Sequence, residues 1–492
     1  MTVTLMHSGL EAAAERFGTR DALRAGVDRW SFVDLDRLAN GFAARLLDAG
    51  VAPGDRVAVM MRNRMDFPVI VHAISKIGAA AVLISPAWKA VEVRHALELT
   101  APVHAVADGP GIELLAKHLP VTDVDVNAPV ARGDVSFPGI SDGAEAVLVF
   151  SSGTTGLPKA VRHTHRSIVH GTRHWVDCLG LGPDDRFQVA TPPSHILGLL
   201  NLLAAAEAGA TVRLHIRFDL DEFLQRIEAE RMTLEMVVAP IALAMANHPQ
   251  LEAHDLTSLR FILWGATPVT RSVADDVTAR TGVRWLQGYG ASELPVIACN
   301  PVHRPGEWRL DSAGLPPAGV ELRVADLDTG TILPAGETGE IQARSPSVME
   351  GYLPEEATID AFVDGWYRTG DVGWLDPDGW IHLTDRAKEM IKVNAFQVAP
   401  AEIEAVLHGH PAVVDCAVFG IPDERAGELP VAAVQLDPER HPADGELEQL
   451  VASSLATYKH LHEVVVVDAI PRLPSGKALR RELRDAFLRA SE

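Results

Sequence analysis

Short runs of β-branched and apolar residues alternate with longer amphipathic runs along the first part of the chain. Arg56–Met61, Ala80–Ile84 and Val103–Ala107 are predicted strands, and Phe67–Lys76 and Lys89–Leu99 are predicted helices between them. Strands separated by helices of this length form right-handed βαβ units with parallel strands. The alternation therefore predicts an α/β fold.

The same alternation restarts after Pro183. One sheet rarely needs so many units, so we predict two packed α/β layers. The predicted strands of the second set are Phe187–Ala190, Thr211–Leu214, Leu234–Val238 and Phe261–Leu263. A helix from about Asp34 to Asp48 precedes both sets, and Ser31 with Asp34 has the spacing of a capping box.

From about residue 316 the sequence changes to short β segments separated by Gly/Pro turns. These segments predict a small β-rich part over about residues 316–384, which completes a large N-terminal domain of residues 1–384. Residues 385–492 predict a separate small α+β domain. The expected elements in these two stretches are Val320–Val324, Gly339–Ala343, Trp380–Leu383, Pro400–Leu407, Val413–Phe419, Leu429–Gln435 and Glu446–Ala456.

The charge balance limits the partners that this chain can have. Its 492 residues carry 44 basic and 66 acidic side chains, a formal net charge of −22. This balance argues against non-specific binding to nucleic acid or to an anionic membrane. The hydrophobic share of 47% is that of a globular protein. Any polyanionic ligand must therefore meet positive charge that is placed locally.

Cysteine usage and apolar runs indicate the compartment. The three cysteines lie far apart and form no C-x-x-C pair, so neither a disulfide framework nor a zinc site is expected. The first residues lack the basic start and apolar core of a signal peptide. The apolar stretch Ile77–Trp88 is too short for a membrane span, which takes about 18 apolar residues. We expect a soluble, cytoplasmic protein.

The strongest chemical signal is a loop of glycines and hydroxyls that follows the predicted strand Val147–Phe150. The loop runs from Ser151 to Lys159 and precedes an expected helix that carries His163. Glycines let backbone N–H groups turn toward a phosphate, hydroxyls donate further hydrogen bonds, and lysine adds a point charge. The spacing is not that of the P-loop. On composition alone, a flexible Ser/Gly/Thr turn remains the alternative.

Five motifs together make the flexible turn an improbable reading. They are SSGTTGLPKAV at Ser151, GYGASE at Gly288, YRTGD at Tyr367, DRAKEMIK at Asp385 and PSGKALRREL at Pro474. Over nearly its whole length the chain resembles the adenylate-forming superfamily, most closely the acyl- and aryl-CoA ligases.

The resemblance implies a two-step reaction. A hydrophobic carboxylic acid attacks the α-phosphate of Mg-ATP to give an acyl-adenylate and pyrophosphate, and the thiol of coenzyme A then displaces AMP. The implied partners are the acid, ATP, coenzyme A and Mg²⁺, with no nucleic acid, no stable membrane insertion and a homodimer left open.

The resemblance also implies nucleotide-binding residues. Tyr289 and Gly290 would lie at the adenine, Ser292 would bond the α-phosphate, and Glu293 would help to hold Mg²⁺. The residues expected to hold the β- and γ-phosphates are Ser151, Ser152, Gly153, Thr154, Thr155, Gly156 and Lys159. From its local sequence alone, and apart from the resemblance, Glu293 is interpreted as a solvent-exposed acidic residue.

Five further positions of the family pattern concern the nucleotide. Asp371 and Arg386 match the ribose contacts, and Gly265 with Ala266 matches the segment at the adenine edge. Lys477 matches the lysine that bridges the α-phosphate and the attacking carboxylate. In isolation, Asp371 reads as a turn aspartate and Lys477 as a solvated lysine.

In the family, the small C-terminal domain is a mobile lid that swings about the position of Asp385, so that one face serves adenylation and another serves thioester formation. Lys392 and Gln397 match residues on the lid that support adenylate chemistry. Between them the chain departs from the pattern, because Asn394, Ala395 and Phe396 stand where coumarate-type ligases read Lys-Gly-Phe. The methyl group of Ala395 narrows the expected coenzyme A tunnel.

His195, Trp264, Gly265 and Gly288 match the acyl pocket. For His195 the alternatives are a gate at the carboxylate and a hydrogen-bonded histidine at a helix start. For Trp264 they are a shortened pocket and plain core filling. Three rival functions stay open: loading of a carrier-protein thiol, a single half-reaction, and non-catalytic binding of a nucleotide or acyl-adenylate.

Overall fold

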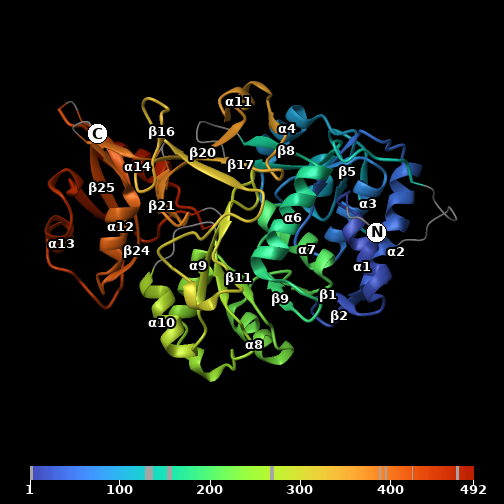
Figure 1. Cartoon of the computed structure of the whole chain (residues 1–492), viewed down its shortest axis with the longest axis horizontal. Helices are drawn as coiled ribbons and strands as arrows, with labels where there is room; N and C mark the ends of the chain where they lie inside the picture. The colour runs from blue at the N-terminus through green and yellow to red at the C-terminus, as the bar shows by residue number, and fades with distance from the viewer. Residues whose placement is uncertain are drawn as a thin grey trace.

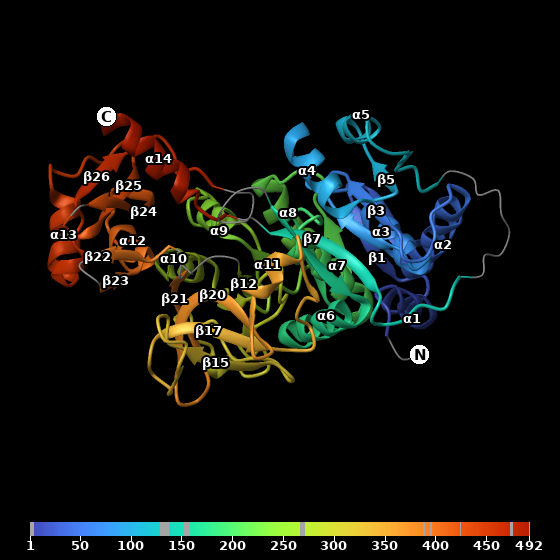
Figure 2. The ribbon, with the colours of Figure 1, turned by 90° about the horizontal axis from the view of Figure 1, so that it is seen from above.

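The structure is a computed structural model that describes residues 4–127, 137–151, 158–265, 271–386, 389–393, 396–423, 425–472 and 476–491. The chain runs from one end of an elongated molecule to the other, and the C-terminal part forms a separate lobe (Figures 1 and 2). No described helix is both long enough and apolar enough to cross a membrane.

A seven-stranded sheet forms the first layer. Its strand order is β18-β8-β7-β4-β3-β5-β6, with parallel pairing from β7 to β6 and antiparallel pairing at β8 and β18. In chain order these strands are β3 (Arg56–Met60), β4 (Ala80–Leu83), β5 (His104–Ala107), β6 (Val121–Asp123), β7 (Glu145–Ser151), β8 (Lys159–Thr164) and β18 (Gly351–Leu353).

Two four-stranded sheets, ordered β2-β1-β10-β9 and β11-β12-β13-β14, form the second layer. Their strands are β1 (Asp21–Ala25), β2 (Asp28–Ser31), β9 (Arg186–Val189), β10 (Thr211–Leu214), β11 (Glu235–Val237), β12 (Ile262–Trp264), β13 (Trp285–Tyr289) and β14 (Ala298–Cys299). The carboxyl end of β13 therefore carries Gly288 and Tyr289.

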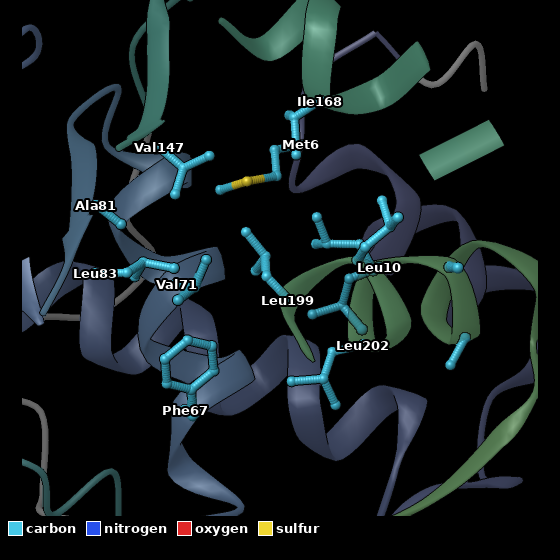
Figure 3. Close-up of a cluster of buried hydrophobic side chains, with 14 of the residues drawn as sticks. Met6, Leu10, Phe67, Val71, Ala81, Leu83, Val147, Ile168, Leu199 and Leu202 are labelled. Atoms are coloured by element: carbon cyan, nitrogen blue, oxygen red, sulfur yellow. The ribbon is translucent and has the colours of Figure 1, made fainter. Parts of the chain in front are cut away.

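One large core joins the two layers. Figure 3 shows part of it, with Ala81, Leu83 and Val147 of the first layer gathered near Leu199 and Leu202 of α7. The helices that contribute buried faces to this core include α1 (Ser8–Phe17), α2 (Phe32–Asp48), α3 (Asp66–Lys76), α6 (His165–Leu179) and α7 (Ile196–Ala208). Smaller cores cover the outer faces, under α4 (Ala90–Thr100) and α5 (Pro110–Leu115) on one side and α8 (Leu220–Glu230), α9 (Ala239–Ala246) and α10 (Arg271–Thr281) on the other.

A β-rich part and an α+β domain complete the chain. The β-rich sheet has the order β16-β15-β17-β20-β19, with β21 paired to β20. Its elements are β15 (Glu321–Ala325), β16 (Ile332–Leu333), β17 (Gly339–Arg344), α11 (Glu356–Ile359), β19 (Phe362–Val363), β20 (Trp366–Leu375) and β21 (Ile381–Arg386). The last domain contains β22 (Ile391–Val393), β23 (Phe396–Val398), α12 (Pro400–His408), β24 (Val413–Asp423), β25 (Gly427–Leu436), α13 (Glu446–Ser454), β26 (Glu463–Val466) and α14 (Arg480–Ser491).

The predicted α/β class with two packed layers, a β-rich part and a small C-terminal domain is confirmed. The capping box is present, because Ser31 Oγ accepts a hydrogen bond from the amide of Asp34 and the Asp34 carboxylate accepts one from the amide of Ser31. One prediction was wrong: the residues after Lys159 form the strand β8, and the helix α6 begins only at His165. The antiparallel partner β7 lies directly before the loop, so the chain doubles back as a hairpin.

Candidate active site

The glycine- and hydroxyl-rich loop is carried on a hairpin. Ser151, the last residue of β7, pairs with Lys159, the first residue of β8. On α4, His95 Nε2 donates a hydrogen bond of 2.9 Å to the carbonyl oxygen of Pro158. The two ends of the loop are therefore fixed, whereas residues 152–157, which include Ser152, Gly153, Thr154, Thr155 and Gly156, lie outside the described part of the chain.

Lys159 is joined to Glu293 through a tyrosine. The Lys159 ammonium lies 5.2 Å from the centre of the Tyr352 ring, and the Tyr352 hydroxyl donates a hydrogen bond of 2.8 Å to Glu293 Oε1. Glu293 is only 8% exposed. The structure thus brings the lysine of the first motif and the acid of the second motif to one place.

The GYGASE turn is packed tightly behind these groups. A Cβ at Gly290 would lie 2.1 Å from the carbonyl oxygen of Pro295, so only glycine fits without a backbone shift. His163 of β8 is fully buried, and its Nε2 donates a hydrogen bond of 2.8 Å to the carbonyl oxygen of Ser292. Burial lowers the pKa of His163 to about 4, so the ring is neutral at pH 7.

Asp371 is held by a second tyrosine. Tyr289 Oη donates a hydrogen bond of 2.5 Å to Asp371 Oδ2, and Asp371 is 7% exposed. Asp371 on β20 faces Arg386 on β21 across the ladder; the Arg386 side chain is outside the described part. Tyr367, also on β20, is buried among these groups. Desolvation, reinforced by the charge of Glu293, raises the pKa of Tyr367 well above its usual value.

The start of α9 closes another side of the site. The Gly265 amide donates a hydrogen bond of 3.3 Å to the Val237 carbonyl at the end of β11. A Cβ at Gly476 would lie 3.0 Å from Pro240 Cδ and 3.8 Å from the Ala239 amide nitrogen. The segment before Lys477 therefore packs against the N-terminus of α9, close to the Gly265 strand end.

Lys477 itself is engaged within the C-terminal domain. Its Nζ lies 3.1 Å from Glu389 Oε1. Arg480 contacts the other oxygen of Glu389 and binds both oxygens of Glu404 at 2.9 Å. Asp385, at the expected hinge, accepts a hydrogen bond of 2.9 Å from the Ala401 amide in the first turn of α12.

The candidate acyl-pocket residues differ in their packing. Trp264 is 1% exposed and lies 5.5 Å from the Trp285 ring, in the outer core beneath α9 and α10. Leu263, on the opposite face of β12, lies against Gly288, with 3.4 Å from its Cδ2 to a Cβ built there. This packing favours the core-filling alternative for Trp264.

His195 is the N-cap residue of α7, yet its side chain makes no cap hydrogen bond. Burial lowers the pKa of the ring, which keeps it neutral. Within the described residues it is therefore not the hydrogen-bonded helix-start histidine of the second alternative, and the gate remains the interpretation to test.

The last sequence-predicted residues lie on the hairpin of β22 and β23. Lys392 is exposed and pairs across the ladder with Gln397. The side chains of Gln397 and Phe396 lie outside the described part, as do Asn394, Ala395 and Ala266.

Sequence reasoning missed Tyr352 and Glu389. Tyrosine is rare in this chain, with only 4 residues, and Tyr289, Tyr352 and Tyr367 all lie at the site. The scarcity of tyrosine could have marked these three residues as candidates for the site. No local pattern, however, indicated that residue 352 pairs with a strand almost two hundred positions earlier.

Comparison with known proteins defines the class. The model of the AMP-binding enzyme family matches residues 10–353, and that of the AMP-binding enzyme C-terminal domain matches residues 402–477. 4-Coumarate–CoA ligase 2 of Oryza sativa subsp. japonica is 36% identical over 495 residues, covering 92% of this chain and 87% of the relative.

Solved structures agree with these matches. ATP-bound MatB from Rhodopseudomonas palustris superposes with a TM-score of 0.93 at 25% identity, covering 100% of both chains. The o-succinylbenzoate CoA synthetase MenE from Bacillus subtilis, in complex with the acyl-adenylate intermediate OSB-AMP, superposes with a TM-score of 0.87 at 29% identity, covering 97% of this chain and 98% of the other. The chain belongs to the AMP-binding enzyme family, and the resemblance inferred from its five motifs is confirmed.

Proposed function

We propose that this chain is an ATP-dependent carboxylic acid–CoA ligase. It adenylates a hydrophobic carboxylic acid with release of pyrophosphate, and it then transfers the acyl group to coenzyme A with release of AMP. The observation that carries the proposal is the convergence of Lys159, Glu293 and Asp371, from three separate motifs, through three contacts that two tyrosines make.

The nucleotide roles follow from the charges. Lys159 and the loop that begins at Ser151 bind the β- and γ-phosphates, Ser292 meets the α-phosphate, and Asp371 with Arg386 binds the ribose. Glu293 fits a role as a Mg²⁺ ligand: it is a buried carboxylate whose Oε2 accepts no hydrogen bond from the described residues. Mg²⁺ keeps several waters and needs few protein oxygens besides the phosphates. When bound, the ion neutralises phosphate charge.

The chemistry requires a cation at the reacting centre. A carboxylate is a poor electrophile with a poor leaving group, and adenylation corrects both faults. Lys477 stabilises the negative charge that develops as the carboxylate attacks the α-phosphate. Its segment already packs against α9 at Pro240, which supports delivery of this lysine from the C-terminal domain of residues 385–492.

The acid lies beside His195, Gly265 and Gly288 in this proposal. Two observations support this placement: Leu263 offers an apolar side chain beside Gly288 and Gly265, and burial keeps the His195 ring neutral. Lys392 and Gln397, on the C-terminal domain, support the adenylate chemistry. That domain turns about Asp385, and Ala395 with Phe396 borders the path of the coenzyme A thiol.

The test is a panel of aromatic and aliphatic acids, including 4-coumarate, incubated with ATP, Mg²⁺ and coenzyme A. Pyrophosphate release reports the first half-reaction, and mass spectrometry of the thioester reports the second. We expect at least one acid to give both products. ATP binding without pyrophosphate release for any acid, and without thioester from supplied adenylate, would instead indicate a non-catalytic binding protein.

The remaining rivals differ in the acceptor or in the number of steps. Thioester formed on an acyl-carrier protein but not on coenzyme A would support the carrier reading. Pyrophosphate without thioester, or thioester only from supplied adenylate, would support a single half-reaction.

A cytoplasmic location belongs to the same proposal because both co-substrates are cytosolic. Light scattering of the purified chain tests for a homodimer.

A further inference from the structure

Tyr352 occupies the strand that closes one edge of the first layer. It lies in the middle of β18, opposite Val161 of β8, two residues along the ladder from Lys159. The side chain is half-buried. Backbone pairing thus fixes the tyrosine beside the base of the phosphate loop, independently of any side-chain contact.

The two ends of the Tyr352 side chain contact opposite charges. The Lys159 ammonium lies over the ring at 5.2 Å, a cation–π geometry. The hydroxyl donates to Glu293 Oε1 at 2.8 Å, and a hydrogen bond to a buried carboxylate is of the strong, charge-assisted kind. Glu293 is held from behind as well, since its carbonyl oxygen accepts from the Met349 amide at 2.8 Å.

Lys159 and Glu293 form no ion pair with each other or with any other described residue. Opposite charges that came into direct contact in a partly buried site would attract each other strongly. A direct pair would neutralise the cation that a phosphate needs and occupy the carboxylate oxygens. The aromatic ring stands between the two groups and satisfies each of them without joining them.

We infer that Tyr352 is a positioning residue that tethers Lys159 and Glu293 while keeping them apart, so that the β- and γ-phosphates of ATP meet a preorganised cation. The inference rests on the proposed role of Lys159 in phosphate binding. It predicts an effect on ATP that AMP, which lacks those phosphates, does not show.

The test compares the dissociation constants of ATP and AMP, each measured with Mg²⁺ by calorimetry without acid or coenzyme A. For Tyr352→Ala we expect ATP binding to weaken about tenfold, as the loss of about 1.4 kcal/mol implies, and AMP binding to stay within about twofold of wild type. For Tyr352→Phe, which keeps the ring and loses the hydroxyl, we expect about threefold weaker ATP binding with AMP again unchanged.

The matched control is Tyr458→Ala, because Tyr458 also carries a lysine over its ring, with Lys459 at 5.6 Å, but lies in the C-terminal domain. We expect it to leave both constants unchanged. Tyr352→Phe also keeps the test decisive if Tyr352→Ala does not fold.

Lys159→Ala separates the inference from the proposed function. If that variant binds ATP as wild type does, the phosphate role of Lys159 is wrong. If it weakens ATP binding while both Tyr352 variants match wild type, or if the Tyr352 variants weaken ATP and AMP equally, the positioning role is wrong. Because Tyr352 acts through Lys159, the two substitutions should not be additive. We expect the double variant Lys159→Ala/Tyr352→Ala to bind ATP as tightly as Lys159→Ala alone.

Discussion

Lys477 Nζ and Glu389 Oε1 form an ion pair of 3.1 Å in which both partners belong to the C-terminal domain. Arg480 fixes the same glutamate and is itself clamped by Glu404. All four residues of this network lie on the C-terminal side of Asp385, so the proposed rotation about that residue would carry the network as a unit. In the proposed mechanism, Lys477 would keep the Glu389 counter-charge during the rotation and exchange it for phosphate oxygens at the reacting centre.

Removal of the Lys477 charge should separate the two half-reactions. We expect Lys477→Ala to reduce pyrophosphate release by at least about a hundredfold, in the range seen when one preorganised donor is removed. Thioester formation from supplied acyl-adenylate should stay within about threefold of wild type, because the developing phosphate charge belongs to the first step only. Equal losses in the two assays would rule out the assigned role.

The close approach at Gly290 should make even one methyl group costly. A Cβ there would lie 2.1 Å from the Pro295 carbonyl oxygen, so Gly290→Ala must move the turn that carries Ser292 and Glu293. We expect about 1–3 kcal/mol lower stability in urea unfolding and at least about tenfold slower adenylation.

Gly182→Ala is the matched control, since a Cβ at Gly182 has open space around it. It should match wild type in both measurements. A Gly290→Ala protein with wild-type kinetics would show that the turn does not need its present position.

Loss of the Tyr289 hydroxyl should affect every nucleotide alike. Tyr289→Phe removes the 2.5 Å hydrogen bond to Asp371 Oδ2 and leaves the carboxylate of this buried residue with one partner fewer. Since the ribose is common to ATP and AMP, we expect both dissociation constants to rise by about three- to tenfold, the equivalent of one hydrogen bond. Weakening of ATP alone would contradict the ribose role of Asp371.

Buried histidines should make the fold sensitive to mild acid. Burial lowers the pKa of His7, His163 and His165 to about 4 and that of His72 to about 3. The unfolded chain takes up protons near pH 6.5 whereas the native state does not, so stability is complete above that pH and falls as the pH drops toward 4. Each such histidine contributes on the order of 1 kcal/mol per pH unit in that window.

Urea unfolding at pH 7, 6 and 5 measures this slope. His72 has an Nδ1 with no hydrogen-bond partner in the described structure, so His72→Leu should flatten the slope by about one proton. An unchanged slope would mean that His72 is not the neutral, buried group described here.

Local patterns predicted the βαβ units well because each strand and helix there buries a face set by its own sequence. The β4 and α3 predictions differ from the observed bounds by a residue at most. The strand β8 was missed because its partner β7 lies across a loop that has no recognisable hairpin turn. Tyr352 could not be placed either, since its contact depends on the pairing of β18 with β8, a long-range event that no local period encodes.

The same limit applies to the site. Motif order assigned Lys159, Glu293, Asp371 and Lys477, and the structure brings the first three together. Motif order could not decide whether Trp264 lines the acyl pocket or fills the core. That choice depends on which face of β12 turns toward α9 and α10.

The hydrogen bond from the Ala401 amide to Asp385 links the end of β21 to the first turn of α12. A C-terminal domain that rotates about residue 385 has to release this bond or carry both partners with it. Release would cost the Ala401 amide its acceptor at the start of a helix, so this bond would favour the orientation seen here over a rotated one.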